Sequence, residues 1–310
     1  MASSSIADSV VVSSASLAQS GRRAIDPKLI ASLAAVYVIW SSTYLAIRIA
    51  VETLPPLLMG SARYASAGLV LLVVAMRRGA RLPHLREWLR VLPVGLLLFL
   101  GGNGFVAISE KTVSSSGAAV VCAMMPLWVG VLGVATRELP TRREWLSLIV
   151  GFIGVVVLMG SPSLDGEPLH VALLVAVPIC WAAGTIYARK LPSSGDNDAL
   201  VAPAMQMITG GVVLLIAGLA IGERVPSDAT TSSWLALGYL WLFGSIIAFT
   251  AYNWLLRNVR PAVATSYAYV NPILAVIIGA TVSGEPLGAS MIIANVLIVG
   301  AVMLALMRPK

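Results

Sequence analysis

The sequence predicts an all-α integral membrane protein with ten transmembrane helices, arranged as two inverted five-helix repeats around a central cavity. The composition, the recurrence of long apolar stretches and an internal repeat carry this prediction. Of the 310 residues, 58% are hydrophobic and 11% are charged, whereas about a quarter of the residues of a soluble domain are charged. So few charges cannot cover a water-facing surface, so we expect lipid around most of the chain.

Apolar stretches of spanning length recur along the chain, separated by short polar segments. About 20 residues of helix cross a bilayer. The ten stretches are residues 28–51, 55–76, 88–108, 114–136, 145–159, 169–188, 200–221, 233–256, 262–282 and 289–307. The fifth is short and is expected to extend into its flanks. Residues 1–27, rich in Ser and Ala, are expected to form a disordered cytoplasmic tail.

Basic residues predict the orientation. With the N-terminus in the cytoplasm, 17 of the 21 Lys and Arg residues face the cytoplasm, three face outward, and Arg63 lies within a span. This asymmetry follows the positive-inside rule and places both termini in the cytoplasm. The net charge of +7 is spread between the spans rather than gathered on one face, so nucleic acid is not an expected partner.

The two halves of the chain repeat each other. Pro126 and Pro272 are separated by 146 residues, and so are Gly154 and Gly300. Trp40 precedes Arg48 by eight residues, as Trp181 precedes Arg189, and the alignment of Gly68 with Gly211 sets Arg63 opposite Gln206. Five spans per repeat, an odd number, require the second half to be inserted upside down. Inverted repeats of this kind are typical of alternating access.

The repeat also carries a family resemblance. Each half has an early Trp in its first helix and a Pro in its fourth helix, followed by a turn that contains Glu; these residues are Trp40, Pro126, Glu138, Trp181, Pro272 and Glu285. The pattern resembles the drug/metabolite transporter superfamily and, within it, the EamA-type exporters, with repeats over residues 28–160 and 169–307. The resemblance implies a cavity lined by helices 1, 3, 4, 6, 8 and 9, and export of metabolites or lipophilic drugs. The branch it is most similar to exports amino acids, aromatic ones included, and methyl viologen.

Polar and aromatic side chains within the spans are the candidates for the cavity wall. An uncharged polar group in lipid needs a partner, so such residues should face protein or water. Trp40 and Tyr44 share one face of the first helix, which fits either a substrate path or an aromatic packing seam. The full set of candidates is Trp40, Tyr44, Arg63, Asn103, Trp181, Tyr252, Asn253, Tyr267 and Asn271.

Arg63 is the one clear charge deep within a span. An ionisable residue inside the membrane is a functional candidate by default, and a guanidinium can grip a carboxylate through two parallel hydrogen bonds. The alternative is a structural role, with Arg63 bound to backbone carbonyls or outer headgroups.

The acidic residues, by contrast, all fall in loops, tails or helix ends, so we expect no mid-depth acid to relay protons. Transport down the gradient of the substrate itself is then sufficient, although coupling to protons stays open. Cys122 and Cys180 have the pattern of buried small apolar residues. No metal site, P-loop or cofactor motif is present in the sequence.

These observations predict a secondary transporter that exports amino acids, aromatic and other neutral ones, by alternating access from the bacterial inner membrane. Its partners are a small-molecule substrate and the lipid bilayer, and a monomer is the expected unit. The alternative is an exporter of flat lipophilic cations such as methyl viologen, because aromatic walls serve both through stacking and cation–π contact. A lipid-modifying membrane enzyme is a more remote alternative, since the reactive clusters that it needs are absent from the sequence.

Overall fold

The computed structural model describes residues 26–113, 118, 121–135, 140–159, 166–191, 199–271, 273–274 and 289–306. Of the tail predicted over residues 1–27, residues 1–25 lie outside the described residues, as do Glu138, Pro272 and Glu285 of the family pattern, and Pro27 is already the first residue of a helix. The chain divides into Met1–Ala31 and Ser32–Lys310. The arrangement that follows is that of the second unit.

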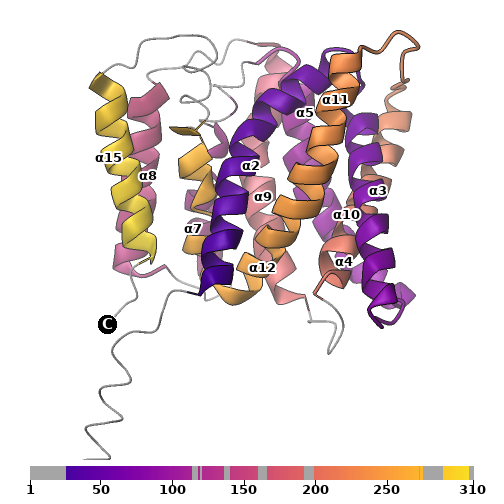
Figure 1. Cartoon of the computed structure of the whole chain (residues 1–310). Coiled ribbons are helices and arrows are strands. Elements are labelled where there is room, and N and C mark those ends of the chain that lie inside the picture. The colour runs from indigo at the N-terminus through magenta and orange to yellow at the C-terminus, as the bar shows by residue number, and fades with distance from the viewer. Residues whose placement is uncertain are drawn as a thin grey trace, which may run out of the picture. The chain divides into compact units, whose positions relative to one another are not determined.

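All regular elements in the described part of the chain are helices, and it contains no strand. Its elements are α2 (Pro27–Val51), α3 (Pro56–Arg77), α4 (Leu85–Val94), η1 (Gly95–Gly104), α5 (Phe105–Ser109), α7 (Met125–Ala135), α8 (Arg142–Met159), α9 (Pro168–Lys190), α10 (Val201–Ala220), α11 (Thr231–Tyr239), η2 (Leu240–Phe249), α12 (Thr250–Asn258), α13 (Pro261–Ala264) and α15 (Ala289–Leu306), shown in Figure 1. The π-helical segment η1 joins α4 to α5 in one continuous helix, and η2 joins α11 to α12 in the same way.

Six of the described helices are long and apolar enough to cross a membrane: Pro27–Val51, Pro56–Arg77, Leu85–Ser109, Pro168–Lys190, Val201–Ala220 and Thr231–Asn258. Each of the ten predicted spans overlaps at least one described helix, and ten crossings stay a prediction. The fifth span extends into its flank as expected, because α8 begins at Arg142.

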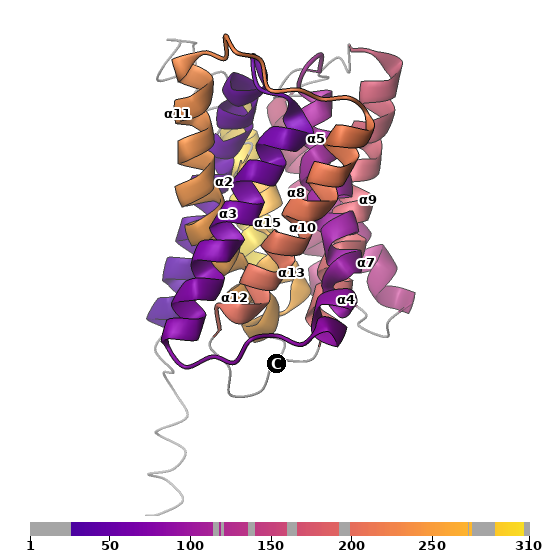
Figure 2. The ribbon, with the colours of Figure 1, turned by 90° about the vertical axis from the view of Figure 1, so that its right-hand side faces the viewer.

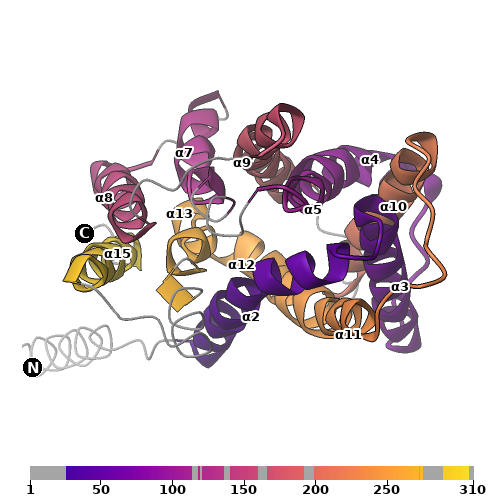
Figure 3. The ribbon, with the colours of Figure 1, turned by 90° about the horizontal axis from the view of Figure 1, so that it is seen from above.

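Two antiparallel helix pairs frame the described bundle (Figure 3), α3 with α10 and α8 with α15. Figure 2 looks onto the first pair. Glu223, just beyond the end of α10, accepts hydrogen bonds from the Leu57 and Leu58 amides at the start of α3. Ser147, near the start of α8, donates to the Ala301 carbonyl near the end of α15. In each pair the end of one helix therefore meets the start of the other, as an inverted relation requires.

The two π-helical segments stand at equivalent places in the two halves. Gly95–Gly104 and Leu240–Phe249 are offset by 145 residues, close to the 146 of the sequence repeat. A π-helical segment widens the helix, and such segments are frequent at functional sites. In each segment a side chain bonds a carbonyl of its own helix: Asn103 Nδ2 donates to Leu98, and Ser245 Oγ to Leu240, each five residues earlier.

The helices of the bundle share two ends, which we name by their charge. The basic end holds the end of α3 at Arg77, the end of α9 at Lys190 and the start of α13 after Arg260. The opposite end holds the end of α2 at Val51 and the end of α5 at Ser109. These two names locate the site below.

Candidate substrate cavity

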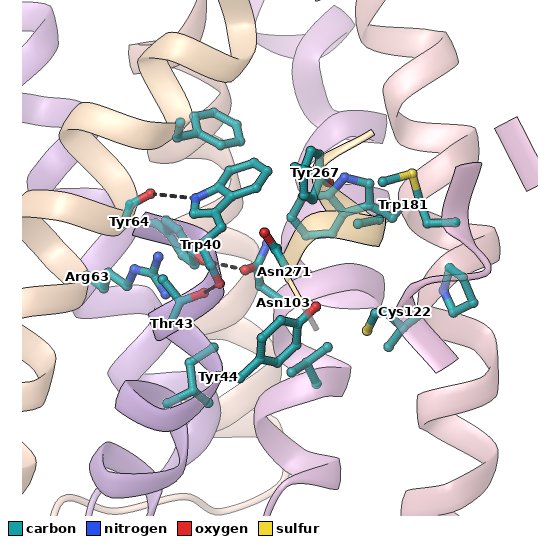
Figure 4. Close-up of a pocket in the computed structure, with 18 residues that line it drawn as sticks. Trp40, Thr43, Tyr44, Arg63, Tyr64, Asn103, Cys122, Trp181, Tyr267 and Asn271 are labelled. Carbon is teal, nitrogen blue, oxygen red and sulfur yellow. Dashed lines mark hydrogen bonds between the residues drawn. The ribbon is translucent and has the colours of Figure 1, made fainter. Parts of the chain in front are cut away.

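A cavity lies inside the bundle, where α2, α3, η1, α9 and η2 meet. It holds about 700 Å³ of space free of atoms, part of it open to the outside. Its walls come from both halves of the chain, including both π-helical segments. Seven of the nine predicted candidates line it (Figure 4): Trp40, Tyr44, Arg63, Asn103, Trp181, Tyr267 and Asn271.

An aromatic layer bounds the cavity around Trp40. The Trp40 ring centroid lies 4.7 Å from that of Tyr267 and 5.8 Å from that of Trp181, both in edge-on geometry. The centroid of Tyr252 is 5.0 Å away. Trp40 Nε1 donates to the Gly244 carbonyl at 3.2 Å, a backbone group of η2. Trp40, Trp181 and Tyr267 line the cavity, so the layer forms one of its walls.

Arg63 brings one positive charge to the cavity wall. Its residue is 5% exposed, and its Nε donates to Ser245 Oγ at 2.7 Å. Its guanidinium carbon lies 4.5 Å from the centroid of the Tyr64 ring. Within the described residues no carboxylate pairs with Arg63. A buried cation with hydroxyl and aromatic partners but no counter-charge keeps its capacity to bind an anion.

The backbone of Gly244 allows Arg63 to take this position. A Cβ atom on Gly244 would lie 2.6 Å from a terminal nitrogen of the Arg63 guanidinium. Any larger residue at this position would force the guanidinium to shift from its place against η2. Since Ser245 follows in the same segment, η2 supplies both the space and the hydrogen-bond partner.

The two cavity asparagines are held by different partners. Asn103 accepts a hydrogen bond of 2.6 Å from the Tyr64 hydroxyl. The Asn271 amide lies 3.1 Å from Ser41 Oγ, and its nitrogen can donate to the Tyr267 carbonyl at 3.0 Å. Both amides thus present oriented polar groups to the cavity.

Two predicted candidates do not line the cavity. Tyr252 is fully buried behind the aromatic layer, where its hydroxyl lies 2.7 Å from the Thr185 hydroxyl. Asn253 Nδ2 donates at 3.0 Å to the Phe249 carbonyl of its own helix. Both lie on a helix face that also carries cavity residues. That face extends beyond the cavity, so these two side chains lie in the packing around it.

Several lining residues are missing from the predicted set, three of them polar or titratable. Thr43 and Tyr64 line the cavity, and Cys122, interpreted from the sequence as a packing residue, lines it too. Tyr64 had a usable signal, because it follows Arg63 in a span and an aromatic neighbour suits a buried cation. Thr43 and Cys122 had none, since small residues within spans are common and their facing depends on packing.

The acidic residues need a correction in one respect. Glu110 follows the span Leu85–Ser109, so it stands at a helix end as predicted. It is nevertheless only 2% exposed, which its position after a span and before Lys111 did not suggest. The sequence located this acid at a helix end but did not predict its burial.

The fold and the cavity together define a class of protein. Large apolar side chains point outward along the helices, among them Val38, Leu69, Leu215 and Ile216, as in helices that meet lipid. Polar and aromatic side chains instead converge on an internal cavity. This is the construction of a multi-pass membrane transporter.

The comparisons with known proteins give the family. The model of the EamA-like transporter family matches residues 28–160 and 169–307, so the chain belongs to that family. It is 42% identical over 281 residues to the uncharacterized inner membrane transporter YedA of Escherichia coli strain K12, covering 89% of this chain and 90% of that protein. It is 25% identical to the uncharacterized transporter YvbV of Bacillus subtilis, covering 90% and 91%. A solved crystal structure, 20% identical, has the same fold, with a TM-score of 0.71 over 90% of this chain and 97% of that one.

Proposed function

We propose that this transporter exports amino acids, aromatic ones among them, from the cytoplasm by alternating access. The observation that carries the proposal is Arg63, a buried guanidinium without a carboxylate partner in the described residues, on the wall of an aromatic cavity. A guanidinium prefers a carboxylate, and rings such as those of Trp40 and Trp181 prefer an apolar or aromatic body. An amino acid combines the two.

Alternating access is supported by the antiparallel pairing of α3 with α10 and of α8 with α15. If equivalent helices exchange conformations, the cavity opens to one end and then to the other. The inner-membrane location is inferred from the Escherichia coli relative, which is named as an inner membrane transporter.

The second candidate is a flat organic cation such as methyl viologen. The aromatic faces around Trp40 favour it through cation–π contact. Arg63 opposes it, because a second positive charge in a cavity of low dielectric is repelled. The charge of Arg63 therefore distinguishes the two substrate classes.

The experiment compares both substrates in proteoliposomes. Purified protein takes up a panel of labelled amino acids and labelled methyl viologen, as wild type and as Arg63→Gln. Gln is chosen because Gln206 occupies the equivalent position in the second repeat. The substitution removes the charge of Arg63 and keeps a polar side chain. Arg224→Gln, an exposed arginine at the opposite end, is the control for a general change in charge.

We expect Arg63→Gln to weaken amino-acid affinity by at least about 30-fold, equal to about 2 kcal/mol for the loss of a charged partner. Methyl viologen transport should be unchanged or improved, with an unchanged melting temperature. Equal loss of both substrates together with a lower melting temperature contradicts the proposal, since Arg63 is then structural.

A further inference from the structure

Glu110 is a buried acid that the proposed cavity does not use. It closes the helix Leu85–Ser109 at the opposite end of the bundle. The residue is 2% exposed, and neither carboxyl oxygen has a hydrogen-bond partner within the described residues. Buried carboxylates normally find such partners, because an unpaired buried charge costs several kcal/mol. Burial of this kind selects the protonated, neutral form of the acid.

The surroundings of Glu110 are apolar. Val106 and Val113, four residues before it and three after, belong to a buried cluster with Ile47, Val121 and Leu174. These residues come from different elements, so a buried apolar cluster forms around the helix end that carries Glu110. None of these five side chains can replace the water that an ionised carboxylate requires.

The ionisable groups on the surrounding elements are few. They are Tyr44 and Arg48 from α2, Arg63 and Tyr64 from α3, Cys122, Glu167 just before α9, His170 from α9, and the neighbouring Lys111. The positive charge that acts on Glu110 is that of Arg48, which is exposed. Burial raises the pKa of the Glu110 carboxyl well above its usual range, and the attraction of Arg48, which lowers it, is the smaller effect.

Glu110 also lies beside the cavity. Its carboxyl is within electrostatic reach of the Tyr44 phenol and the Cys122 thiol, and both of these side chains line the cavity. Val106, one helical turn before Glu110, lines it as well. A rearrangement of the cavity wall therefore changes the environment of this acid.

We propose that Glu110 is the proton-binding residue through which this transporter exchanges a proton for its substrate; this rests on the proposed function. In the described arrangement the carboxyl is neutral and buried. When the cavity opens to the other side of the membrane, Glu110 becomes exposed to water and releases its proton, leaving a carboxylate. A proton taken up from the other side restores the O–H bond and the buried state. One proton moves in one direction for each substrate that moves in the other, and no other bond forms or breaks.

This linkage has a definite sign. A carboxyl with a raised pKa binds its proton more tightly in the described arrangement, where it is buried, than in water, so low pH favours that arrangement. As pH rises from the ordinary Glu pKa of about 4.3 through the raised value, the described arrangement loses stability. Substrate binding and proton binding are then reciprocal, as in any coupled pair of sites.

The test uses proteoliposomes with the membrane potential clamped at zero and labelled phenylalanine as the probe. Two quantities are measured: tracer exchange at equal pH, and accumulation with a lumen one pH unit more acidic than the medium. Exchange for one proton drives substrate into the acidic lumen, and one pH unit corresponds to about tenfold accumulation, since each unit is about 1.36 kcal/mol. The variants are Glu110→Gln, which cannot ionise, Glu110→Asp, and the exposed Glu52→Gln as a matched control at the same end.

We expect about tenfold accumulation for wild type and Glu52→Gln. Glu110→Gln should accumulate nothing, and Glu110→Asp should restore accumulation with a shifted pH profile. The proposal is overturned if Glu110→Gln accumulates like wild type, if wild type exchanges phenylalanine without responding to the pH gradient, or if Glu110→Gln loses exchange together with melting temperature at every pH.

A second readout separates this proposal from the proposed function. Melting temperatures of wild type, Glu110→Gln and Glu52→Gln are compared from pH 5 to pH 9. If phenylalanine is not transported at all, the proposed function fails, but wild type should still lose melting temperature relative to Glu110→Gln as pH rises. Parallel pH dependences of the two proteins would show that Glu110 does not hold the proton.

Discussion

Arg63 Nε donates a hydrogen bond of 2.7 Å to the hydroxyl of Ser245, 182 residues further along the chain. The bond joins α3 in the first family-matched half to η2 in the second. The cation that we assign to substrate binding is therefore positioned by the half that must move against it. Any conformational change that separates α3 from η2 therefore also changes the hydrogen bond that positions Arg63.

Removing this acceptor should weaken substrate binding without abolishing it. In Ser245→Ala the guanidinium keeps its charge and its contact with Tyr64 but loses its fixed direction. Hydrogen bonds between membrane helices contribute about 0.6 kcal/mol on average and about 1.7 at most, so we expect half-saturation to rise about threefold, and no more than about twentyfold. Uptake kinetics in proteoliposomes measure this, and a loss as large as that of Arg63→Gln contradicts it.

The contact between α3 and α10 depends on glycine. A Cβ atom on Gly211 would lie 2.6 Å from the Ala65 backbone nitrogen, and one on Gly68 2.8 Å from the Ala204 carbonyl oxygen. These two glycines are the pair that the sequence repeat aligns. Gly211→Ala should destabilise the protein by about 1–3 kcal/mol, because the backbones must separate, and lower its melting temperature in detergent.

Gly238 provides the control for that substitution. It lies in α11, and a Cβ there meets nothing within 4 Å. Gly238→Ala should leave the melting temperature unchanged or raise it slightly, since Ala favours a helix over Gly by about 0.5–1 kcal/mol. Equal effects of the two substitutions would show that close packing is not the cause.

The two cysteines offer a test of the cavity in the native chain. Cys122 lines it, whereas Cys180 packs against Gly101 and does not. A saturating substrate should slow the reaction of Cys122 with a small membrane-permeable maleimide by at least about tenfold, and leave Cys180 unaffected. The rates are measured in Cys180→Ser and Cys122→Ser, each with one cysteine left. Equal protection of both would indicate a general change in structure rather than occupancy.

The orientation can be tested in intact cells. In a Cys122→Ser/Cys180→Ser background, a cysteine at Arg86 should resist an impermeant thiol reagent, and one at Arg224 should react. The expectation comes from the distribution of Lys and Arg, which keeps basic loops in the cytoplasm. The reverse labelling pattern would overturn the orientation and, with it, the direction of export.

The sequence by itself determined the helices, the repeat and most of the candidate residues. Composition and the length of apolar stretches fix helices in lipid, because no other segment satisfies its own backbone there. The offset of 146 residues between Pro126 and Pro272 was enough to indicate the repeat. The two π-helical segments of the structure have nearly the same offset. Trp40 and Arg63 stood out as an aromatic and a charge within apolar spans.

Only the tertiary structure decided which face of each helix meets the cavity and which acid is buried. Tyr252 and Tyr267 are both spanning tyrosines, yet one packs behind the aromatic layer and the other lines the cavity, because the crossing of the helices sets their facing. The sequence shows Glu110 only as a helix-end acid. In the structure its neighbours Val106 and Val113 form a buried cluster with residues distant in sequence, such as Ile47 and Leu174. Burial is a property of these long-range contacts, and the pattern of neighbouring residues does not contain it.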